Sequence, residues 1–132
     1  MKDAISVPKE DFDSIYSELT KLDAVMFHAD TGSVVLQLTT HIPDAMDMNG
    51  IKIAKTQSGE MSLTSLLMKK DFYDIFLVRE TLYGGKESLS FAIVGEDEKI
   101  ALSIYMRRSD ANTIEIKSKE LFEKLWTKYF KL

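Results

Sequence analysis

Three consecutive segments in the second half of the sequence alternate apolar and polar residues with a period of two. They run from Tyr73 to Leu82, from Ser88 to Val94 and from Lys99 to Arg107. Short turn sequences separate them, with Gly84-Gly85 in the first gap and Gly95-Glu96-Asp97-Glu98 in the second. A period of two places alternate side chains on opposite faces of a strand, and short connections join antiparallel neighbours. The sequence therefore predicts an antiparallel β-meander at the centre of an α+β fold.

Helical patterns lie at both ends of the chain. From about Pro8 to Leu22 apolar residues recur at helical spacing, and Pro8 suits the first helical position. Ser118 can cap a second helix, which carries a broad apolar stripe made of Leu121, Phe122, Leu125, Trp126, Tyr129 and Phe130. We expect both helices to pack against the sheet and Trp126 to be largely buried.

Shorter strands are predicted between the first helix and the meander, at about 24–28, 33–41 and 50–56. In the second of these, Val34, Leu36 and Leu38 are expected to face the core, and Gln37 and His41 lie on the opposite, more polar face. Residues 42–50 form a connector with Pro43 and Asn49-Gly50 as turn signals. Residues 61–70 fit either a short strand or a turn of helix.

Length and composition exclude several classes of protein. A chain of 132 residues predicts one domain, 1–132, and the absence of cysteine excludes disulfides, iron–sulfur clusters and thiolate catalysis and fits the cytoplasm. The net charge of −4, without a basic stripe, is unlike that of a nucleic-acid-binding protein. No apolar run reaches the ~20 residues of a membrane helix, and the beginning of the chain is unlike a signal peptide. We therefore expect a soluble cytoplasmic protein without nucleic-acid or membrane partners.

Residues with ligand chemistry are few, and no catalytic motif is present, so we predict that the protein is not an enzyme. His41 is the first candidate, because Gln37 shares its face and a connector with Met46 and Met48 follows. Imidazole and thioether groups can both bind haem iron, so His41 is the candidate metal ligand. The competing interpretation is structural: lone histidines form hydrogen bonds, and methionines fill gaps in cores.

Arg79 is a second kind of candidate. It shares a strand face with Tyr73, Ile75 and Leu77, so its guanidinium lies at the end of an apolar strip. Such an arginine can hold the carboxylate of an apolar ligand, or it can form an ion pair at the rim of the sheet. Both alternatives remain open from the residues alone.

Several of these segments together resemble the cytosolic haem-utilisation carriers of bacteria, the HutX/ChuX-like family. That family has a Val-Glu-Arg-x-x-x-Gly pattern, a Ser-x-Ser strand, an aromatic residue near an Arg-Asp, and a closing helix with a Leu-x-x-Phe stripe. The corresponding residues here are Val78-Arg79-Glu80 with Gly84, then Ser88-Leu89-Ser90, then Tyr105 with Arg108-Ser109-Asp110. Upstream, Val25-Met26-Phe27-His28 resembles the opening strand of the family.

The resemblance implies a split, saddle-like antiparallel sheet with helices at both ends, working as a homodimer in haem utilisation and iron metabolism. It implies a small-molecule carrier that binds and transfers haem or another tetrapyrrole. Two departures support an alternative, an interaction or sensor domain that keeps the fold without haem. The family's Gly-His-Gly and Gly-His-Leu segments fall near Met48-Asn49-Gly50 and Ser65-Leu66-Leu67, which have no histidine.

Self-association is also expected from the physics of sheet edges. A sheet of about seven strands has two edges, and the sequence offers only two helices to cover it. The strand from Tyr73 to Leu82 and its two successors are strongly apolar on one face. Uncovered edges and faces favour association, most often with two-fold symmetry. We therefore expect a homodimer whose interface uses the sheet and buries at least ~1,000 Å².

Overall fold

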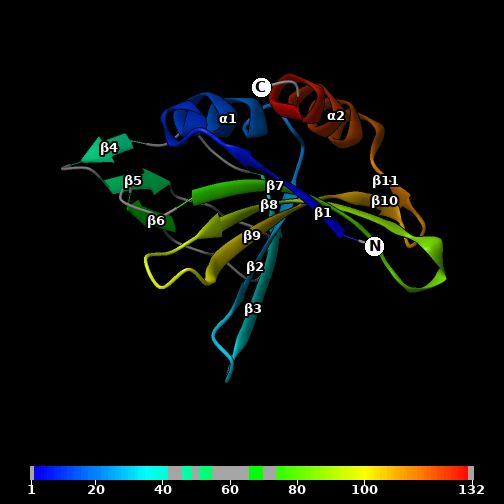
Figure 1. Cartoon of the computed structure of the whole chain (residues 1–132), viewed down its shortest axis with the longest axis horizontal. Coiled ribbons are helices and arrows are strands. Elements are labelled where there is room, and N and C mark those ends of the chain that lie inside the picture. Colours follow the sequence, from blue (N-terminus) through cyan, green and yellow to red (C-terminus); the bar gives the residue numbers. More distant parts are fainter. Residues whose placement is uncertain (1, 42–45, 49–50, 55–65, 70–73, 131–132) are drawn as a thin grey trace.

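The computed structural model describes residues 2–41, 46–48, 51–54, 66–69 and 74–130. Its centre is a six-stranded antiparallel sheet of order β1-β7-β8-β9-β2-β3 (Figure 1). The strands are β1 (Lys2–Val7), β2 (Val25–Asp30), β3 (Val35–Thr40), β7 (Asp74–Thr81), β8 (Glu87–Val94) and β9 (Ile100–Met106). β4 (Met46–Met48), β5 (Ile51–Ala54) and β6 (Leu66–Lys69) form a second sheet, and β10 (Arg108–Asp110) pairs with β11 (Thr113–Ile114). The predicted α+β fold with an antiparallel sheet and two helices is confirmed.

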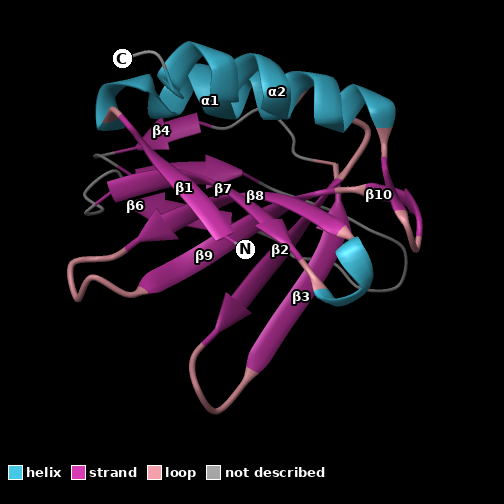
Figure 2. Cartoon of the chain, turned by 45° about the vertical axis from the view of Figure 1, so that its right-hand side comes forward, coloured by secondary structure: helices cyan, strands magenta, loops and turns pink. Residues whose placement is uncertain are grey.

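Two helices cover one face of the six-stranded sheet (Figure 2). They are α1 (Phe12–Leu19), which follows the short 3₁₀ helix η1 (Lys9–Asp11), and α2 (Ile116–Phe130). Facing them, Leu77, Phe91, Ile104 and Phe27 lie opposite one another across four neighbouring strands. All four are buried, because their strands alternate inward and outward residues in matching register. The predicted meander and its core face are therefore confirmed.

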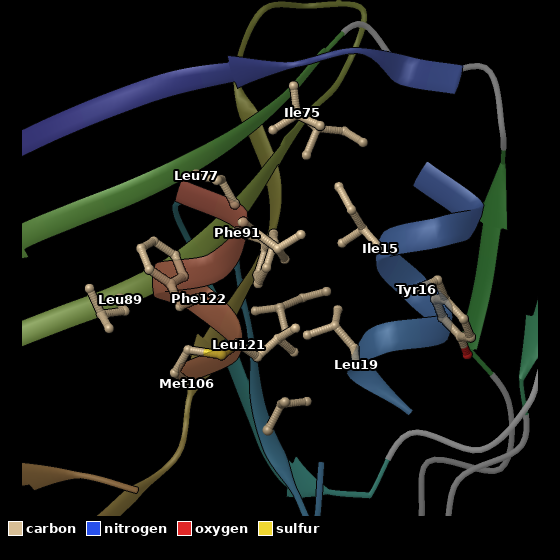
Figure 3. Close-up of a cluster of buried hydrophobic side chains, with 14 of the residues drawn as sticks. Ile15, Tyr16, Leu19, Ile75, Leu77, Leu89, Phe91, Met106, Leu121 and Phe122 are labelled. Carbon is tan, nitrogen blue, oxygen red and sulfur yellow. The ribbon is translucent and has the colours of Figure 1, made fainter. Parts of the chain in front are cut away.

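The buried cluster under the helices joins side chains from both helices and from strands β1, β2, β7, β8 and β9 (Figure 3). Phe122 of α2 is fully buried and contacts Phe91 of β8, with ring centroids 5.9 Å apart in an edge-on arrangement. Ile15, Tyr16 and Leu19 of α1 enter the same cluster. Burial of this apolar surface is the main stabilising contribution expected for a domain of this size.

Several expected boundaries are wrong. β1 was not predicted, since only Ile5 and Val7 alternate there, yet it pairs antiparallel with β7 over six residues. α2 begins two residues before Ser118, so Ser118 does not cap it: this side chain is fully buried and donates to Glu115 Oε1 at 3.3 Å. Trp126 is only partly buried, because it lies at the edge of the stripe, stacked between Phe122 and Phe130.

The region between β3 and β7 also differs from the expectation. The predicted connector contains β4, and the ambiguous segment 61–70 contains the strand β6, so the strand alternative is the correct one. The turn at Gly84-Gly85 lies between β7 and β8 as predicted, and both glycines have positive φ. That backbone conformation is open to glycine and costly for other residues.

The expected burial of Val34 and Leu36, at the beginning of β3, is wrong. Val34 and Leu36 are 54% and 65% exposed, although they follow the same alternation as the inward residues of β2. The β2–β3 hairpin extends beyond the end of the helical layer (Figure 2), so no helix covers these side chains. Apolar alternation identified the face of the strand, while burial depends on how far the covering elements reach.

Candidate functional site

The candidate site lies on the open face of the six-stranded sheet, opposite the helices. Small buried residues form its floor, namely Ser88, Ser90 and Ala92 of β8 and Ser103 of β9. Register places Ser90 beside Tyr105, and Ser103 between Ala92 and His28. Of these small residues, Ser88 and Ser103 each line a hollow on this face.

His28 is held in place by the neighbouring strand. It lies opposite Gln37 in the β2–β3 pairing, and Gln37 Nε2 is 2.9 Å from His28 Nδ1. The ring of Tyr105 stands edge-on to the imidazole, with centroids 5.9 Å apart and an interplanar angle of 87°. As placed, the amide donates to Nδ1, which leaves the proton of a neutral imidazole on Nε2.

Two hollows adjoin Tyr105. One, of about 490 Å³, is lined by His28, Asp30, Lys99 and Ser103 among others. The other, of about 480 Å³, is lined by Met26, Thr39, Ser88 and the arginines at the end of β9. We call the two together the open-face trough. The two hollows share Tyr105 in their lining.

The far end of the open-face trough is basic. Arg108 Nη2 donates to the carbonyl oxygen of Glu87, and Arg108 Nη1 is buried without a hydrogen-bond partner among the described residues. Arg107 forms an ion pair with Glu115 at 3.7 Å. A buried guanidinium nitrogen without an acceptor favours a ligand that supplies one, and a carboxylate is the usual partner.

His41, the candidate ligand from the sequence, lies elsewhere. Its Nε2 is 3.0 Å from the carbonyl oxygen of Thr20 at the end of α1. A carbonyl only accepts, so Nε2 carries the proton and Nδ1 is the remaining lone pair. The structure therefore does not bring His41 and Gln37 together: Gln37 contacts His28 across the hairpin, and His41 reaches back to α1.

Arg79 lies on the helix-covered face of β7. It forms an ion pair with Glu123 of α2, and its guanidinium carbon lies 4.9 Å from the ring centroid of Trp126. Of the two sequence interpretations, the ion pair is the one present in the structure. Met46 and Met48 belong to β4, where they pair in register with Ile53 and Ile51. Their side chains lie outside the described part of the chain.

No cluster of three or more histidine, cysteine, aspartate or glutamate side chains that could hold a metal ion occurs in the described residues. Across these residues, no helix is long and apolar enough to cross a membrane. His28, rather than His41, is the histidine that contacts Gln37 in the structure. The signal was available in the hairpin itself, since folding the chain about Thr31-Gly32 places residue 28 opposite residue 37.

Comparison with known proteins identifies the family. The model of the haem utilisation family ChuX/HutX matches residues 5–125. The chain belongs to this family. No significant match was found among the curated proteins.

Solved structures share the fold at low sequence identity. A protein from Agrobacterium tumefaciens is 24% identical with a TM-score of 0.82, over 96% of this chain and 71% of that one. The haem-binding protein ChuX is 18% identical with a TM-score of 0.81, over 98% of this chain and 79% of that one. ChuS, described as a haem oxygenase of E. coli, is 14% identical with a TM-score of 0.74 over 92% of this chain. The chain spans only 36% of ChuS.

Proposed function

We propose that this chain binds haem, or a closely related tetrapyrrole, and transfers it to another protein in the cytoplasm without transforming it. The observation that carries the proposal is the pairing of His28 with Gln37 beside Tyr105, over a floor of small buried residues. Membership of the haem utilisation family supports the same ligand class.

The residues of the open-face trough fit the group chemically. Imidazole binds haem iron, and a ligating histidine usually donates its other ring N–H to a second side chain. Here Gln37 is that second side chain. Turning its amide over would present Oε1 as an acceptor for Nδ1–H, leaving the Nε2 lone pair for iron. The ring of Tyr105 and the floor of the trough would hold the apolar macrocycle.

The basic end of the trough fits the acidic substituents of the same ligand. The unpartnered Nη1 of Arg108, together with Arg107, would donate hydrogen bonds to carboxylates at the end away from His28. His41, Met46 and Met48 remain candidate ligands from the sequence, and Arg79 a candidate carboxylate contact. The contacts in the structure favour His28 over His41. Arg108 is favoured over Arg79 because Arg79, whose Nε is also buried without a partner among the described residues, is held by Glu123 and Trp126 on the helix-covered face.

Transfer is favoured over degradation because both hollows open onto the surface of the sheet. Oxidative chemistry on a tetrapyrrole is helped by a closed site that excludes water. An open trough instead allows the ligand to leave toward an acceptor. The competing function is an interaction or sensor domain that keeps the fold without haem, as the missing histidines near Met48 and Ser65 suggest.

Titration with hemin tests the proposal. We expect a Soret band that differs from that of free hemin and saturates at one equivalent per chain. His28→Ala should abolish or shift this band and leave the far-ultraviolet circular dichroism unchanged. His41→Ala is the matched control and should retain the wild-type spectrum.

Three outcomes would contradict the assignment in different ways. A band that survives His28→Ala but is lost in His41→Ala would move iron ligation to His41. A band that survives in both variants would remove histidine ligation. Absence of any saturable band in the wild type would favour the interaction domain.

We also propose that the working form is a homodimer. From the sequence we expected the dimer to cover the apolar face of β7, β8 and β9. That reason does not apply, because α1 and α2 bury this face within one chain. The support for a homodimer now comes from Val34, Val35 and Leu36 at the β2–β3 hairpin, which are apolar and each more than half exposed.

A further inference from the structure

Two arginines line the basic end of the open-face trough, and the structure holds them in different ways. Arg108 is fixed: its Nη2 donates to the carbonyl oxygen of Glu87, and its Nη1 is buried without a partner among the described residues. Arg107 is exposed and forms an ion pair with Glu115, in which Nη1 and Oε2 are 3.7 Å apart. A charge-assisted hydrogen bond between such groups is about 2.7–2.9 Å long, so the Arg107–Glu115 pair is a loose one.

Glu115 is held in place independently of the Arg107 side chain. It directly precedes α2, beside β10 and β11 (Figure 1), and its carbonyl oxygen accepts the backbone N–H of Lys119 at 2.9 Å. Its own N–H donates to the carbonyl oxygen of Arg107 at 2.9 Å, and its Oε1 accepts the hydroxyl of the fully buried Ser118 at 3.3 Å. The helix dipole also stabilises a carboxylate at the beginning of a helix. The Glu115 carboxylate therefore keeps favourable contacts when the Arg107 side chain moves away.

Arg107 borders both Glu115 and the trough. It lines the same hollow as Tyr105 and Arg108, and exposed side chains of this length change rotamer rapidly. A ligand carboxylate held by Arg108 would lie next to Arg107. It would offer this guanidinium a close, bidentate partner in place of the loose contact with Glu115. The ligand carboxylate and Glu115 are therefore alternative partners of one guanidinium.

We propose that Glu115 competes with a carboxylate of the bound tetrapyrrole for Arg107, and that this competition weakens the hold of the open-face trough on its ligand. The inference rests on the haem-carrier function proposed above, and it adds Glu115 as a positioning residue that sets the affinity without touching the ligand. Arg108 provides the constant contact and Arg107 the exchangeable one. When the ligand leaves, Glu115 pairs with Arg107 again. Release therefore leaves no unpaired charge at Arg107, which favours transfer to an acceptor.

Titrations with hemin and with hemin dimethyl ester, whose carboxylates are blocked, test the competition in the same cosolvent. Glu115→Gln should bind hemin about two- to fivefold more tightly than the wild type, because partly exposed ion pairs contribute little free energy. Its affinity for the dimethyl ester should equal that of the wild type. A purely structural change at the beginning of α2 would alter both affinities alike, so the ratio of the two affinities is the informative quantity.

Three further variants separate pairing from charge and from folding. Glu120→Gln is the matched control, because it removes the same charge from an exposed position on the same helix, and it should leave both affinities unchanged. Glu115→Asp keeps the charge and suits the beginning of a helix, but it withdraws the carboxylate from Arg107, so it should also tighten hemin binding. Adding Arg107→Gln to Glu115→Gln should remove the gain. Circular dichroism of each variant should match that of the wild type.

The rate of release gives an independent measurement. Capture of hemin by excess apomyoglobin should be slower from Glu115→Gln than from the wild type by the same factor, because most changes in affinity lie in the dissociation rate. An unchanged ratio of affinities in Glu115→Gln, a gain that survives in the double variant, or an equal gain in Glu120→Gln would overturn this inference alone. A wild type without a saturable hemin band would overturn the haem-carrier function and this inference with it.

Discussion

The two faces of the six-stranded sheet use the same strands for different purposes. Under the helices, β7, β8 and β9 present Leu77, Phe91 and Ile104, which interlock with the stripe of α2. On the open face, the intervening positions of β8 and β9 carry serines and alanine, next to His28 and Tyr105. A packed face fills its space with its own side chains. A face floored by small residues leaves space for something else, and stability and binding should therefore respond to different substitutions.

The largest effect on stability is expected for Phe122→Ala on the packed face. Phe122 is fully buried and its ring contacts those of Phe91 and Trp126, each with centroids 5.9 Å apart. Removing the ring leaves a cavity that the two-layer core can fill only in part, which should cost about 3–5 kcal/mol of unfolding free energy. Urea unfolding at pH 7 measures it.

A matched substitution on the other face sharpens this comparison. Ser90→Ala removes a buried hydroxyl from the open face, opposite Tyr105, and should change the free energy of unfolding by less than about 1 kcal/mol. Equal losses in Phe122→Ala and Ser90→Ala would mean that both faces are packed to the same degree, and the distinction between them would fail.

A smaller effect on stability is expected for the hydrogen bond that joins α2 to η1. Tyr129 of α2 donates its hydroxyl to Asp11 Oδ2 at 2.8 Å. Burial, and then the hydrogen bond and charge of Asp11, raise the pKa of Tyr129 from 10.0 to about 12. Tyr129→Phe should lower the unfolding free energy at pH 7 by about 1–2 kcal/mol, since Asp11 loses its donor.

The same bond predicts a pH dependence with a definite sign. Below pH 10 the tyrosine is neutral in both folded and unfolded chains, so the stabilisation is complete. Between pH 10 and about 12 the unfolded chain releases the proton more readily, so the contribution falls as the pH rises. Wild type and Tyr129→Phe should therefore converge in stability across this window. Tyr83→Phe, at a fully exposed position, should follow the wild type at every pH.

The sequence was sufficient to predict which residues of β7–β9 pack under the helices, but it was insufficient to predict the contacts on the open face. The reasons are physical. Strands with a strict period of two identify their inward residues, and Leu77, which was placed on the apolar face of its strand, is buried there. The same rule failed at Val34 and Leu36, because alternation carries no information about where the helical layer ends. Ser118 was assigned to a cap by its residue type, but it lies inside α2, where a buried serine bonds to Glu115.

Predicting the candidate site required knowing which residues of β2 and β3 lie opposite one another, and the pattern of a single strand does not show this. Gln37 was predicted from the sequence to lie on the same polar face as the candidate ligand. Its predicted partner was His41, further along the same strand. The structure pairs it with His28 of the adjacent strand instead. Arg79 was placed correctly on the apolar face, yet only the position of α2 could show that Glu123 and Trp126 engage it.

The smallest effect on stability, combined with a clear effect on binding, is expected for Gln37→Leu. Gln37 is exposed, so losing its hydrogen bond to His28 should change the unfolding free energy by no more than about 0.5 kcal/mol. If His28 binds haem iron as proposed, the amide would matter more for binding, because it would fix the orientation of the imidazole and, once turned over, would accept its second ring proton. Loss of such a partner typically weakens binding about 10–100-fold, so hemin affinity should fall by that factor. Gln37→Glu should restore or exceed wild-type affinity, since a carboxylate accepts the same proton more strongly. If Gln37→Leu binds hemin as tightly as the wild type while His28→Ala does not, His28 would act without a supporting side chain. If neither variant differs from the wild type, the open face would not be the binding face at all.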